Sequence, residues 1–365
     1  MNSTPTPVIN ITDLYHPHQD VGDNFDLLLP FALSDRIELL AVIMDGTQRF
    51  REAKADHPNP DYRDHHGPRD SGFIPMIQLN SIFGKNVPCG VGPYFTMSHV
   101  DDTLENIPLF QQSGVQLILE TLNRHPGPVE VTIFGSCRTL AVAYNRDPEL
   151  LKKKIKRVHI NAGTYPAGYL EWNVMLDPFA FQRLVESDLP IALYPCATEK
   201  GPFDKGQNNT FWQMPDLDWV GKMPPKLCRY LGFALQRVHR MDFLRALEED
   251  WPQLEAPDAF DPNFHRHHDV WETAIWMEVA KLRLVQRSDR SYRLLPEAEI
   301  AATDRKIEGG LKLVEFAYAG DGQISISTVK PLRQCWLYER SDPAEQEKAL
   351  CEALPELYRN FLVPM

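Results

Sequence analysis

Short apolar runs alternate with amphipathic stretches along most of the chain. The apolar runs are rich in β-branched residues, as in "PVINITD", "IELLAVIMD", "VEVTIFGS", "RVHINAG" and "PIALYPC", and such runs are typical of buried strands. Between them, stretches such as "GVQLILETLNRHPG" and "PFAFQRLVES" carry apolar residues at helical spacing. This alternation predicts an α/β fold with a mostly parallel open sheet flanked by helices.

Several individual elements follow from the same pattern. The first helix is expected over Asp23–Leu33, with Asp23 as its N-cap and Asp26 three positions further on. "TLAVAYNRDPELLKKK" and "HHDVWETAIWMEVAKLRLV" each predict one helix, the second opened by an acidic residue. "LKLVEFAYAGDGQISISTVK" predicts a β-hairpin that turns at Gly320-Asp321-Gly322, and a helix follows it at the end of the chain.

No linker composition or internal repeat divides the chain, so residues 1–365 are expected to form a single domain. The polar, histidine-rich stretch 47–72 predicts a long loop. The glycine, asparagine and aromatic residues of 198–225 predict a lid or mobile insertion. Residues 305–365 form a C-terminal hairpin and helix extension, which we expect to contact another subunit or to cover the site.

Composition limits the partners of the protein. A formal net charge of -12 opposes binding to a polyanion such as DNA or to an acidic membrane surface. Six scattered cysteines without a C-x-x-C pair indicate reduced thiols. The chain shows neither a secretory leader pattern nor a long uninterrupted apolar run. We therefore expect a cytoplasmic protein without a nucleic-acid or membrane partner.

Four aspartates, Asp13, Asp20, Asp23 and Asp26, lie at the end of the first predicted strand and the start of the next helix. Ligands of open parallel sheets bind at this edge. Converging carboxylates repel one another unless they share a cation, and oxygen ligands favour Ca²⁺ or Mg²⁺ over zinc. The alternative is that Asp23 and Asp26 cap the helix while the other two are solvated. The pattern favours a metal site.

Two further segments could carry chemistry. In "EWNVMLDP", Glu171 and Asn173 would point the same way from an extended stretch and could bind a vicinal diol. In "HRHHD", the spacing of the three histidines does not place them all on one helical face, whereas the pair His268 and Asp269 could serve as an acid and a ligand. A solvated loop is the alternative for the first segment, and a surface histidine is the alternative for the second.

The order of these segments resembles the inosine-uridine-preferring nucleoside hydrolase family over roughly the first 285 residues. The sharpest similarity runs through "HPGPVEVTIFGSCRTLAVAYNRDPELLKKKIKRVHINAG" and "EWNVMLDPFAFQRLVESDLPIALYPC". A similarity of this length is more specific than a short motif. The family's fold implies a nucleoside hydrolase-like domain here.

The resemblance also implies a metal site. Asp13 corresponds to the first carboxylate of the family's acidic motif, while Asp20 and Asp23 compete for the acidic pair that follows. Arg138 stands where the family's threonine gives its backbone carbonyl to Ca²⁺, and Asp269 matches the aspartate that completes the metal shell. The expected cofactor is therefore Ca²⁺, with Mg²⁺ as the alternative.

The same resemblance implies sugar contacts. Glu171 and Asn173 match the pair that binds ribose hydroxyls. Asn24 stands at the place of a second adjacent aspartate and Thr47 at the place of the family's asparagine, so both are candidate substrate contacts together with Asp20. A changed residue at Thr47 implies a substrate preference that differs from that of ordinary ribonucleosides.

The implied activity is hydrolysis of the N-glycosidic bond of a ribonucleoside or a related N-riboside. A Ca²⁺-bound water would attack the anomeric carbon, Asp13 would take its proton, and His268 would protonate the departing base. The family also implies a homo-oligomer, either a dimer or a tetramer, and a role in purine or pyrimidine salvage. The alternatives are a non-catalytic nucleoside- or sugar-binding protein and another metal-dependent hydrolase such as a phosphatase.

Overall fold

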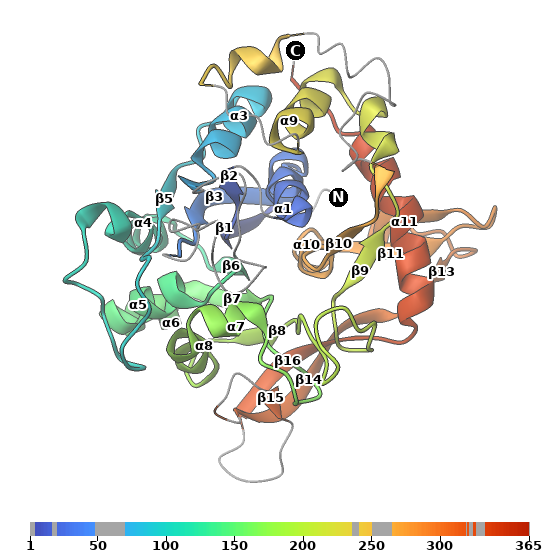
Figure 1. The fold of residues 1–365 in the computed structure, drawn as a ribbon. Helices are drawn as coiled ribbons and strands as arrows, with labels where there is room; N and C mark the ends of the chain where they lie inside the picture. The colour runs from blue at the N-terminus through green and yellow to red at the C-terminus, as the bar shows by residue number, and fades with distance from the viewer. Residues whose placement is uncertain are drawn as a thin grey trace, which may run out of the picture.

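A nine-stranded sheet forms the centre of the protein (Figure 1). The structure, a computed structural model, describes residues 4–16, 20–47, 70–235, 241–249, 265–318, 320, 324–325 and 333–364. Within this part of the chain the strand order is β15-β14-β16-β8-β7-β6-β1-β3-β5. Neighbours from β16 to β5 are parallel, whereas β14 is antiparallel to both β16 and β15. The predicted fold class is therefore confirmed.

The strands of this sheet come from both ends of the chain. Their bounds are β1 Thr6–Thr12, β3 Ile37–Met44, β5 Cys89–Val91, β6 Val129–Phe134, β7 Ile155–Ile160, β8 Ile191–Leu193, β14 Gly309–Tyr318, β15 Ile324–Ser325 and β16 Arg333–Arg340. Three smaller sheets comprise β2 Tyr15–His16 with β4 Asp70–Ser71, β9 Trp212–Met214 with β10 His268–Val270, and β11 Leu282–Gln286 between β12 Tyr292–Pro296 and β13 Arg305–Lys306.

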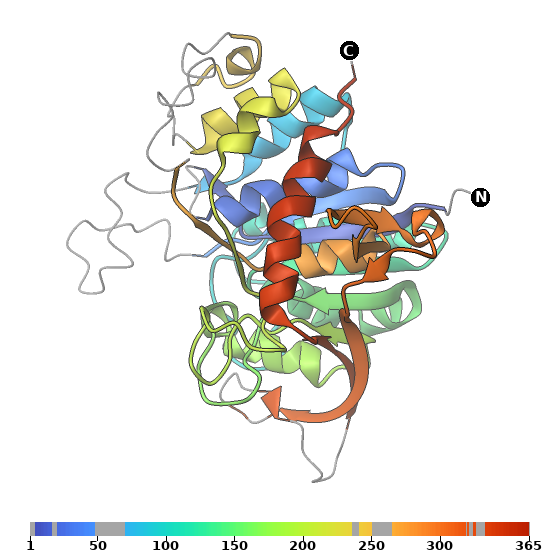
Figure 2. The same ribbon diagram turned by 90° about the vertical axis from the view of Figure 1, so that its right-hand side faces the viewer.

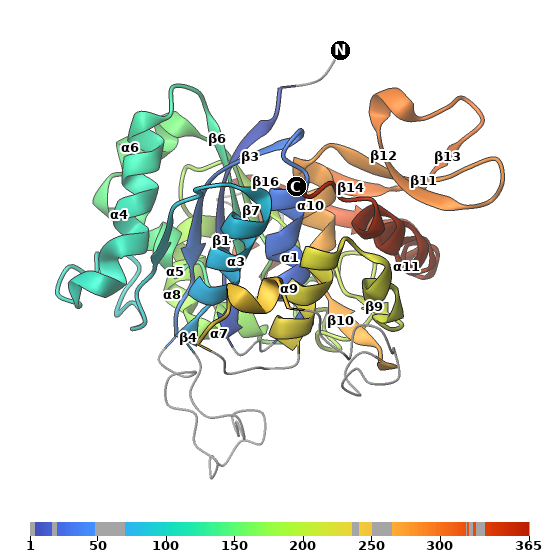
Figure 3. The same ribbon diagram turned by 90° about the horizontal axis from the view of Figure 1, so that it is seen from above.

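Helices cover both faces of the large sheet (Figures 1 and 3). One layer contains α4 Leu109–Arg124, α5 Arg138–Arg146, α6 Pro148–Lys154 and α8 Pro178–Val185. The other contains α1 Val21–Ala32, α3 Phe73–Phe83, α9 Pro225–Leu235, α10 Thr273–Val279 and α11 Pro343–Arg359. The short helix α7, Trp172–Leu176, lies between β7 and α8 in the chain, and 3-10 turns span Asp218–Lys222, Arg245–Leu247 and Glu297–Glu299.

Each central strand contributes alternate side chains to two separate cores. Val8, Met44 and Phe134 face the core on the α1 side, while Ile9 and Ile133 face the core on the α4 side. All five are at most 3% exposed. Strands buried on both faces have continuous apolar sequences, which is why these runs could be recognised from the sequence alone.

The C-terminal segment completes the sheet. β14 pairs with β16 from Gly309↔Arg340 to Phe316↔Arg333, and it also pairs with β15 at Tyr318↔Ile324. Figure 2 shows α11 running along the side of the molecule that carries these strands. The expected hairpin is therefore present as β14 and β15, although residues 321–323 of its turn lie outside the described residues. The strand β16 was not predicted.

Three helix boundaries differ from the sequence prediction. The first helix begins at Val21, because the extended Asp20, not Asp23, is its N-cap and accepts a hydrogen bond from the N–H of Gly22. The stretch 138–154 forms two helices, because Pro148 cannot continue α5 and Asp147 caps α6. The stretch around 268–286 forms β10, α10 and β11; α10 is followed by Lys281 in the left-handed region at φ 55.

The two segments expected to be loops or lids have different outcomes. Residues 198–225 contain β9 and bury Trp212 and Val220 completely, so this segment is packed against the rest of the protein. Its opening as a lid stays a prediction. Most of the stretch 47–72 lies outside the described residues. No helix in the described ranges has the length and apolar character needed to cross a membrane.

Candidate active site at the carboxyl edge of the sheet

Two aspartates meet where adjacent parallel strands end. Asp13 follows β1 and Asp45 follows β3, and the last pair in the register of these strands is Thr12↔Met44. Gly135 follows β6 on the other side of β1. A Cβ atom on Gly135 would lie 3.0 Å from Cβ of Asp13 and 3.1 Å from Oδ2 of Asp45. Glycine at this position therefore leaves room for both carboxylates.

The start of α1 brings a third carboxylate against a residue that the sequence interpretation did not select, Glu272. Asp20 caps α1 by accepting a 2.8 Å hydrogen bond from the N–H of Gly22. A Cβ atom on Gly22 would lie 2.8 Å from Oε2 of Glu272 and 3.3 Å from Oδ1 of Asp20. The Asp20 and Glu272 carboxylates thus converge on the same glycine, one from α1 and the other from the N-cap of α10.

These carboxylates raise the pKa values of one another. Burial raises the pKa of Asp13 well above its usual value, and the charges of Asp45, Glu272 and Asp20 raise it further. Burial raises the pKa of Glu272 to about 7, with a contribution from Asp20. The pKa of Asp20 rises to about 6 for the same reason, and Asp269 adds to this rise. The cluster therefore favours a bound proton or a cation.

Two more aspartates of α1 belong to the cluster. Burial and then the charge of Asp13 raise the pKa of Asp23, which is 6% exposed. Burial and then Glu272 raise the pKa of Asp26, whose Oδ1 accepts a hydrogen bond from the indole of Trp276. All four aspartates selected from the sequence are thus linked electrostatically with Glu272.

Asn24, the predicted replacement for an aspartate, lies between them in the sequence of α1. Its side chain is fully buried, and neither Oδ1 nor Nδ2 has a hydrogen-bond partner in the described part of the chain. A buried amide without partners costs free energy, so this position provides an unused donor and acceptor beside Asp23. The contact of Asn24 with substrate stays a prediction.

The chemistry of the donor set fits a hard cation, because the cluster consists of carboxylates. Nevertheless, among the described residues no group of three or more His, Cys, Asp or Glu side chains is arranged to hold a metal ion. The carboxylates share an edge of the sheet but not a common centre. Binding a cation would require their side chains to turn toward it.

The loop after β3 is held in place by several contacts. Asp45 accepts hydrogen bonds from the N–H of Ser136 at 2.8 Å and from its hydroxyl at 3.1 Å. Thr47, the predicted sugar contact, donates its N–H to the phenol of Tyr15 at 2.8 Å. Burial raises the pKa of Asp45 to about 6, although the charge of Arg138 and the Ser136 bonds oppose the rise. Asp45 is the second acidic residue that the sequence interpretation missed.

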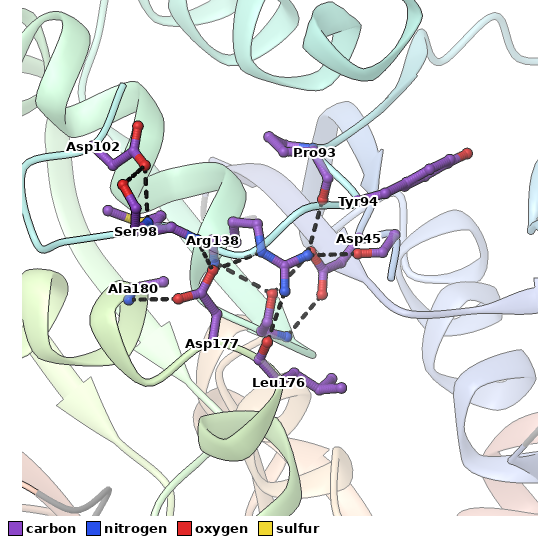
Figure 4. Close-up of polar contacts among 12 residues, drawn as sticks. Asp45, Pro93, Tyr94, Ser98, Asp102, Arg138, Leu176, Asp177 and Ala180 are labelled. Carbon is purple, nitrogen blue, oxygen red and sulfur yellow. Dashed lines mark hydrogen bonds and ion pairs between the residues drawn. The ribbon is translucent and has the colours of Figure 1, made fainter. Parts of the chain in front are cut away.

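Arg138 lies at the start of α5, where the resemblance assigned its backbone carbonyl to the metal. Its side chain is completely buried and forms an ion pair with Asp177 at 2.7 Å. The guanidinium also donates to the carbonyls of Gly46 at 2.8 Å, Pro93 at 2.9 Å and Leu176 at 2.9 Å. Figure 4 shows the side chain between Pro93 on one side and Leu176 with Asp177 on the other. The role of the Arg138 backbone carbonyl as a metal ligand stays a prediction.

Glu171 and Asn173 lie at the start of α7, not in an extended stretch as predicted. Glu171 is the N-cap and accepts from the N–H groups of Gly163 at 3.0 Å, Asn173 at 2.9 Å and Val174 at 3.2 Å. Burial raises the pKa of Glu171 to about 7, although the hydrogen bonds from these N–H groups lower it. The Asn173 amide donates to the carbonyl of Asn161 at 2.9 Å. The helix forms because a capping glutamate satisfies its first N–H groups.

His268 and Asp269 lie on β10, which pairs with β9, so this segment is a strand and not the start of a helix. His268 is 6% exposed. Asp269 accepts a 3.1 Å hydrogen bond from Gln213 and is close enough to Asp20 to raise its pKa. The acidic residue that directly opens α10 is Glu272, three positions later.

The structure thus brings most of the predicted acidic residues to one edge, and it adds two. Both additions carried a sequence signal. Asp45 directly follows a buried β-branched run, as Asp13 does, and Glu272 directly precedes the apolar residues of α10. The three histidines that precede Asp269 favoured this aspartate as a candidate, and Glu272 was not selected.

Comparisons with known proteins agree with this architecture. The family described as inosine-uridine preferring nucleoside hydrolase matches residues 22–262. An uncharacterized protein of Schizosaccharomyces pombe is 32% identical over 90 residues, which cover 22% of this chain and 28% of that protein. The pyrimidine-specific ribonucleoside hydrolase RihA of Citrobacter koseri is 31% identical over 85 residues, covering 22% of this chain and 27% of that protein. The aligned stretches thus span less than a third of either relative.

Solved structures show the same fold along nearly the whole chain. The inosine-uridine preferring nucleoside hydrolase from Bacillus anthracis has a TM-score of 0.50 and 14% identity, with 97% of this chain and 99% of that chain covered. The plant nucleoside hydrolase PpNRh1 has a TM-score of 0.51 and 13% identity, with the same coverage. Because the family match extends over more than half of the chain, this protein belongs to the inosine-uridine preferring nucleoside hydrolase family.

Proposed function

We propose that this protein hydrolyses the N-glycosidic bond of a ribonucleoside or a related N-riboside, assisted by a divalent cation. The observation that carries the proposal is the pairing of Asp13 with Asp45 and of Asp20 with Glu272 at the carboxyl edge of the sheet, where the charges of the other three raise the pKa of Asp13. Membership of the nucleoside hydrolase family supports the choice of reaction. A cluster that repels itself electrostatically is suited to a substrate that becomes positively charged as it reacts.

The residues of the site would have different roles in the reaction. Asp13 would accept the proton of the attacking water, since burial and the neighbouring carboxylates raise its pKa and make it a stronger base. The surrounding carboxylates would stabilise positive charge on the sugar ring. Glu171 and Asn173 would orient the ribose hydroxyls, with Asp20, Asn24 and Thr47 as further contacts. His268 would donate a proton to the departing base.

Asp13, Asp20, Asp23 and Glu272 would hold the cation, with Asp269 and the backbone carbonyl of Arg138 as further candidates. Glu272 joins this set because its carboxylate meets that of Asp20 at Gly22. A bound Ca²⁺ or Mg²⁺ would lower the pKa of a coordinated water. Because one divalent cation offsets only two negative charges, it would reduce the repulsion among the carboxylates without removing it.

The proposal is tested by measuring reducing sugar released from a panel of purine and pyrimidine ribonucleosides, with Ca²⁺, with Mg²⁺ and with a chelator. Wild-type protein should release sugar in the presence of a cation. Asp13→Ala and Glu272→Ala should each lower the rate by at least about 100-fold, the typical contribution of a proton-transfer or charge-stabilising group. Asp269→Ala tests whether the strand residue also contributes.

Asp35→Ala is a suitable control, because the Asp35 side chain is 71% exposed in the turn after α1. This variant should release sugar at the wild-type rate. Sugar release that is unchanged in Asp13→Ala and Glu272→Ala would contradict the assignment of the site. Absence of release from every nucleoside tested would contradict the proposed reaction itself.

The contacts of α7 oppose the ribose orientation that turnover needs, which leaves a second candidate function, a nucleoside- or sugar-binding protein without turnover. The Glu171 carboxylate already accepts three backbone N–H groups, and Asn173 already donates to Asn161. These groups would have to give up internal bonds to hold ribose hydroxyls. Isothermal titration with ribose and with nucleosides separates the candidates, because saturable binding of an intact nucleoside without sugar release supports the second.

A further inference from the structure

A single buried side chain connects the parts of the proposed site that lie far apart in the sequence. Arg138 donates from Nη1 to Gly46 in the loop after β3 and to Pro93 in the loop after β5. It donates from Nε and Nη2 to Asp177 and Leu176 at the junction of α7 and α8. These partners are separated from Arg138 by 38 to 92 positions in the chain. Figure 4 shows Pro93, Leu176 and Asp177 around one guanidinium.

We propose that Arg138 is a positioning residue that fixes the spacing between the acidic edge of the sheet and α7. The proposal rests on the proposed function, because it assigns these two regions to the same sugar. The acidic side contributes Asp45 and Thr47, which flank Gly46 in the sequence. The other side contributes Glu171 and Asn173 at the start of α7.

The loop after β3 has little freedom around the Arg138 contact. Tyr15 donates its phenol to the carbonyl of Asp45 at 3.4 Å and accepts the N–H of Thr47. A Cβ atom on Gly46 would lie 2.2 Å from the ring of Tyr94, so the loop after β5 packs directly on this glycine. Movement of the guanidinium would therefore move the loop that carries Asp45 and Thr47.

The helix α7 carries the effect to the other side of the site. It spans only Trp172–Leu176, so the end that contacts Arg138 and the capped end at Glu171 belong to one short rigid element. Asp177 is also fixed, because it accepts the N–H of Met97 at 2.9 Å and caps α8 through Ala180. Displacement of Leu176 would therefore also displace Glu171 and Asn173, because no flexible loop separates them from Leu176.

The geometry requires arginine in particular. A guanidinium is planar and presents donors in fixed directions, and here those donors reach four acceptors on three separate segments. A lysine would keep the positive charge opposite Asp177 but could not reach all of these acceptors in the same plane. Arg138→Lys therefore removes the spacing function while it leaves a charge partner for the buried carboxylate.

The test compares Arg138→Lys with Arg146→Lys. Arg146 is a matched control, because it also lies in α5 and donates to two backbone carbonyls, Thr103 and Leu104, and to Gln112, away from the acidic edge. Steady-state kinetics with the best nucleoside should show kcat/KM at least about tenfold lower for Arg138→Lys, with most of the change in KM, because a misplaced sugar contact weakens orientation. Arg146→Lys should stay within twofold of wild type.

Hydrogen exchange provides a readout that needs no turnover. In Arg138→Lys, exchange should increase together in residues 45–47 and 172–177, and in Arg146→Lys it should remain at the wild-type level in both segments. Concerted change without any nucleoside turnover in the wild type would keep the inference while removing the proposed function. If Arg138→Lys does not fold, Asp177→Glu keeps both charges and displaces the guanidinium's partner by one methylene group, with the same expectations.

Two outcomes would overturn the inference. One is a folded Arg138→Lys variant whose kcat/KM and exchange match those of wild type. The other is an equal loss of kcat/KM in Arg146→Lys, which would show that any hydrogen-bonded arginine of α5 supports activity through general stability.

Discussion

Replacement of Glu272 by glutamine should stabilise the cation-free protein at alkaline pH. Glu272 is 8% exposed and its pKa is raised from 4.5 to about 7 by burial and by the charge of Asp20. Because the folded pKa exceeds the unfolded one, the stability linked to this group is fully present below about pH 4.5 and is lost as pH rises through about 7. Glutamine cannot ionise, so the variant should not show this loss.

The size of the effect follows from the shift. A difference of one pKa unit corresponds to about 1.4 kcal/mol, so the rise to about 7 corresponds to about 3 kcal/mol at pH 8. Glutamine preserves the size of the side chain and an oxygen that accepts the 3.0 Å hydrogen bond from the N–H of Trp271. Glu272→Gln should therefore unfold at a higher urea concentration than wild type at pH 8 in a chelator, and at a similar concentration at pH 4.5.

The same urea titrations in Ca²⁺ complete the experiment. Ca²⁺ should stabilise wild type more than Glu272→Gln, because the variant lacks one proposed ligand. Glu278→Gln is the matched control on α10: it contacts Arg157 and Arg283 near the surface, and its loss should change stability by at most about 1 kcal/mol at either pH. The reasoning is refuted if Glu272→Gln is less stable than wild type at pH 8 in the chelator, or if Ca²⁺ stabilises both proteins equally.

Three other substitutions, one of them with a control variant, test separate features of the site. Glu171→Ala should lower the free energy of unfolding by about 1–2 kcal/mol, because it removes the cap of α7; an unchanged urea midpoint would contradict this. Gly135→Ala should lower kcat/KM about tenfold, because its Cβ would lie 3.0 Å from that of Asp13. Gly221→Ala, which meets open space, should behave as wild type in the same assay. His268→Ala should lower kcat about 100-fold with little change in KM, and an unchanged kcat would indicate a structural histidine.

The core strands could be predicted because burial on both faces leaves a continuous β-branched run in the sequence. The parallel direction of these strands could also be predicted, since a helix separates each strand from the next in the sequence. The elements of the stretch around 268–286 could not be predicted from the sequence pattern in this way. Its apolar residues belong to a strand, a helix and a second strand, and the boundaries depend on pairing with β9 and on the left-handed Lys281. Neither the strand pairing nor the left-handed residue produces a hydrophobic periodicity in the local sequence.

In the site, too, features set by the local sequence could be predicted, whereas contacts between remote segments could not. Asp13 was selected because it follows a buried strand, and the structure places it beside Asp45, which has the same signal. The contacts of the Arg138 side chain could not be predicted, because its acceptors lie on three segments remote in sequence. The extended interpretation of Glu171 and Asn173 was wrong, because a capping interaction depends on which N–H groups are unpaired.

The electrostatic cost of the acidic edge is connected with the reaction proposed for it. Asp20 and Asp23 lie at the N-terminus of α1, where the helix dipole favours negative charge, yet burial and neighbouring carboxylates still raise their pKa values. The resting protein therefore holds carboxylates in an environment that disfavours their ionised form. A substrate that gains positive charge between ground state and transition state would relieve this repulsion only as it reacts, and interactions that strengthen only in the transition state raise the rate. The features that destabilise the cation-free site are thus those expected to stabilise the oxocarbenium-like sugar.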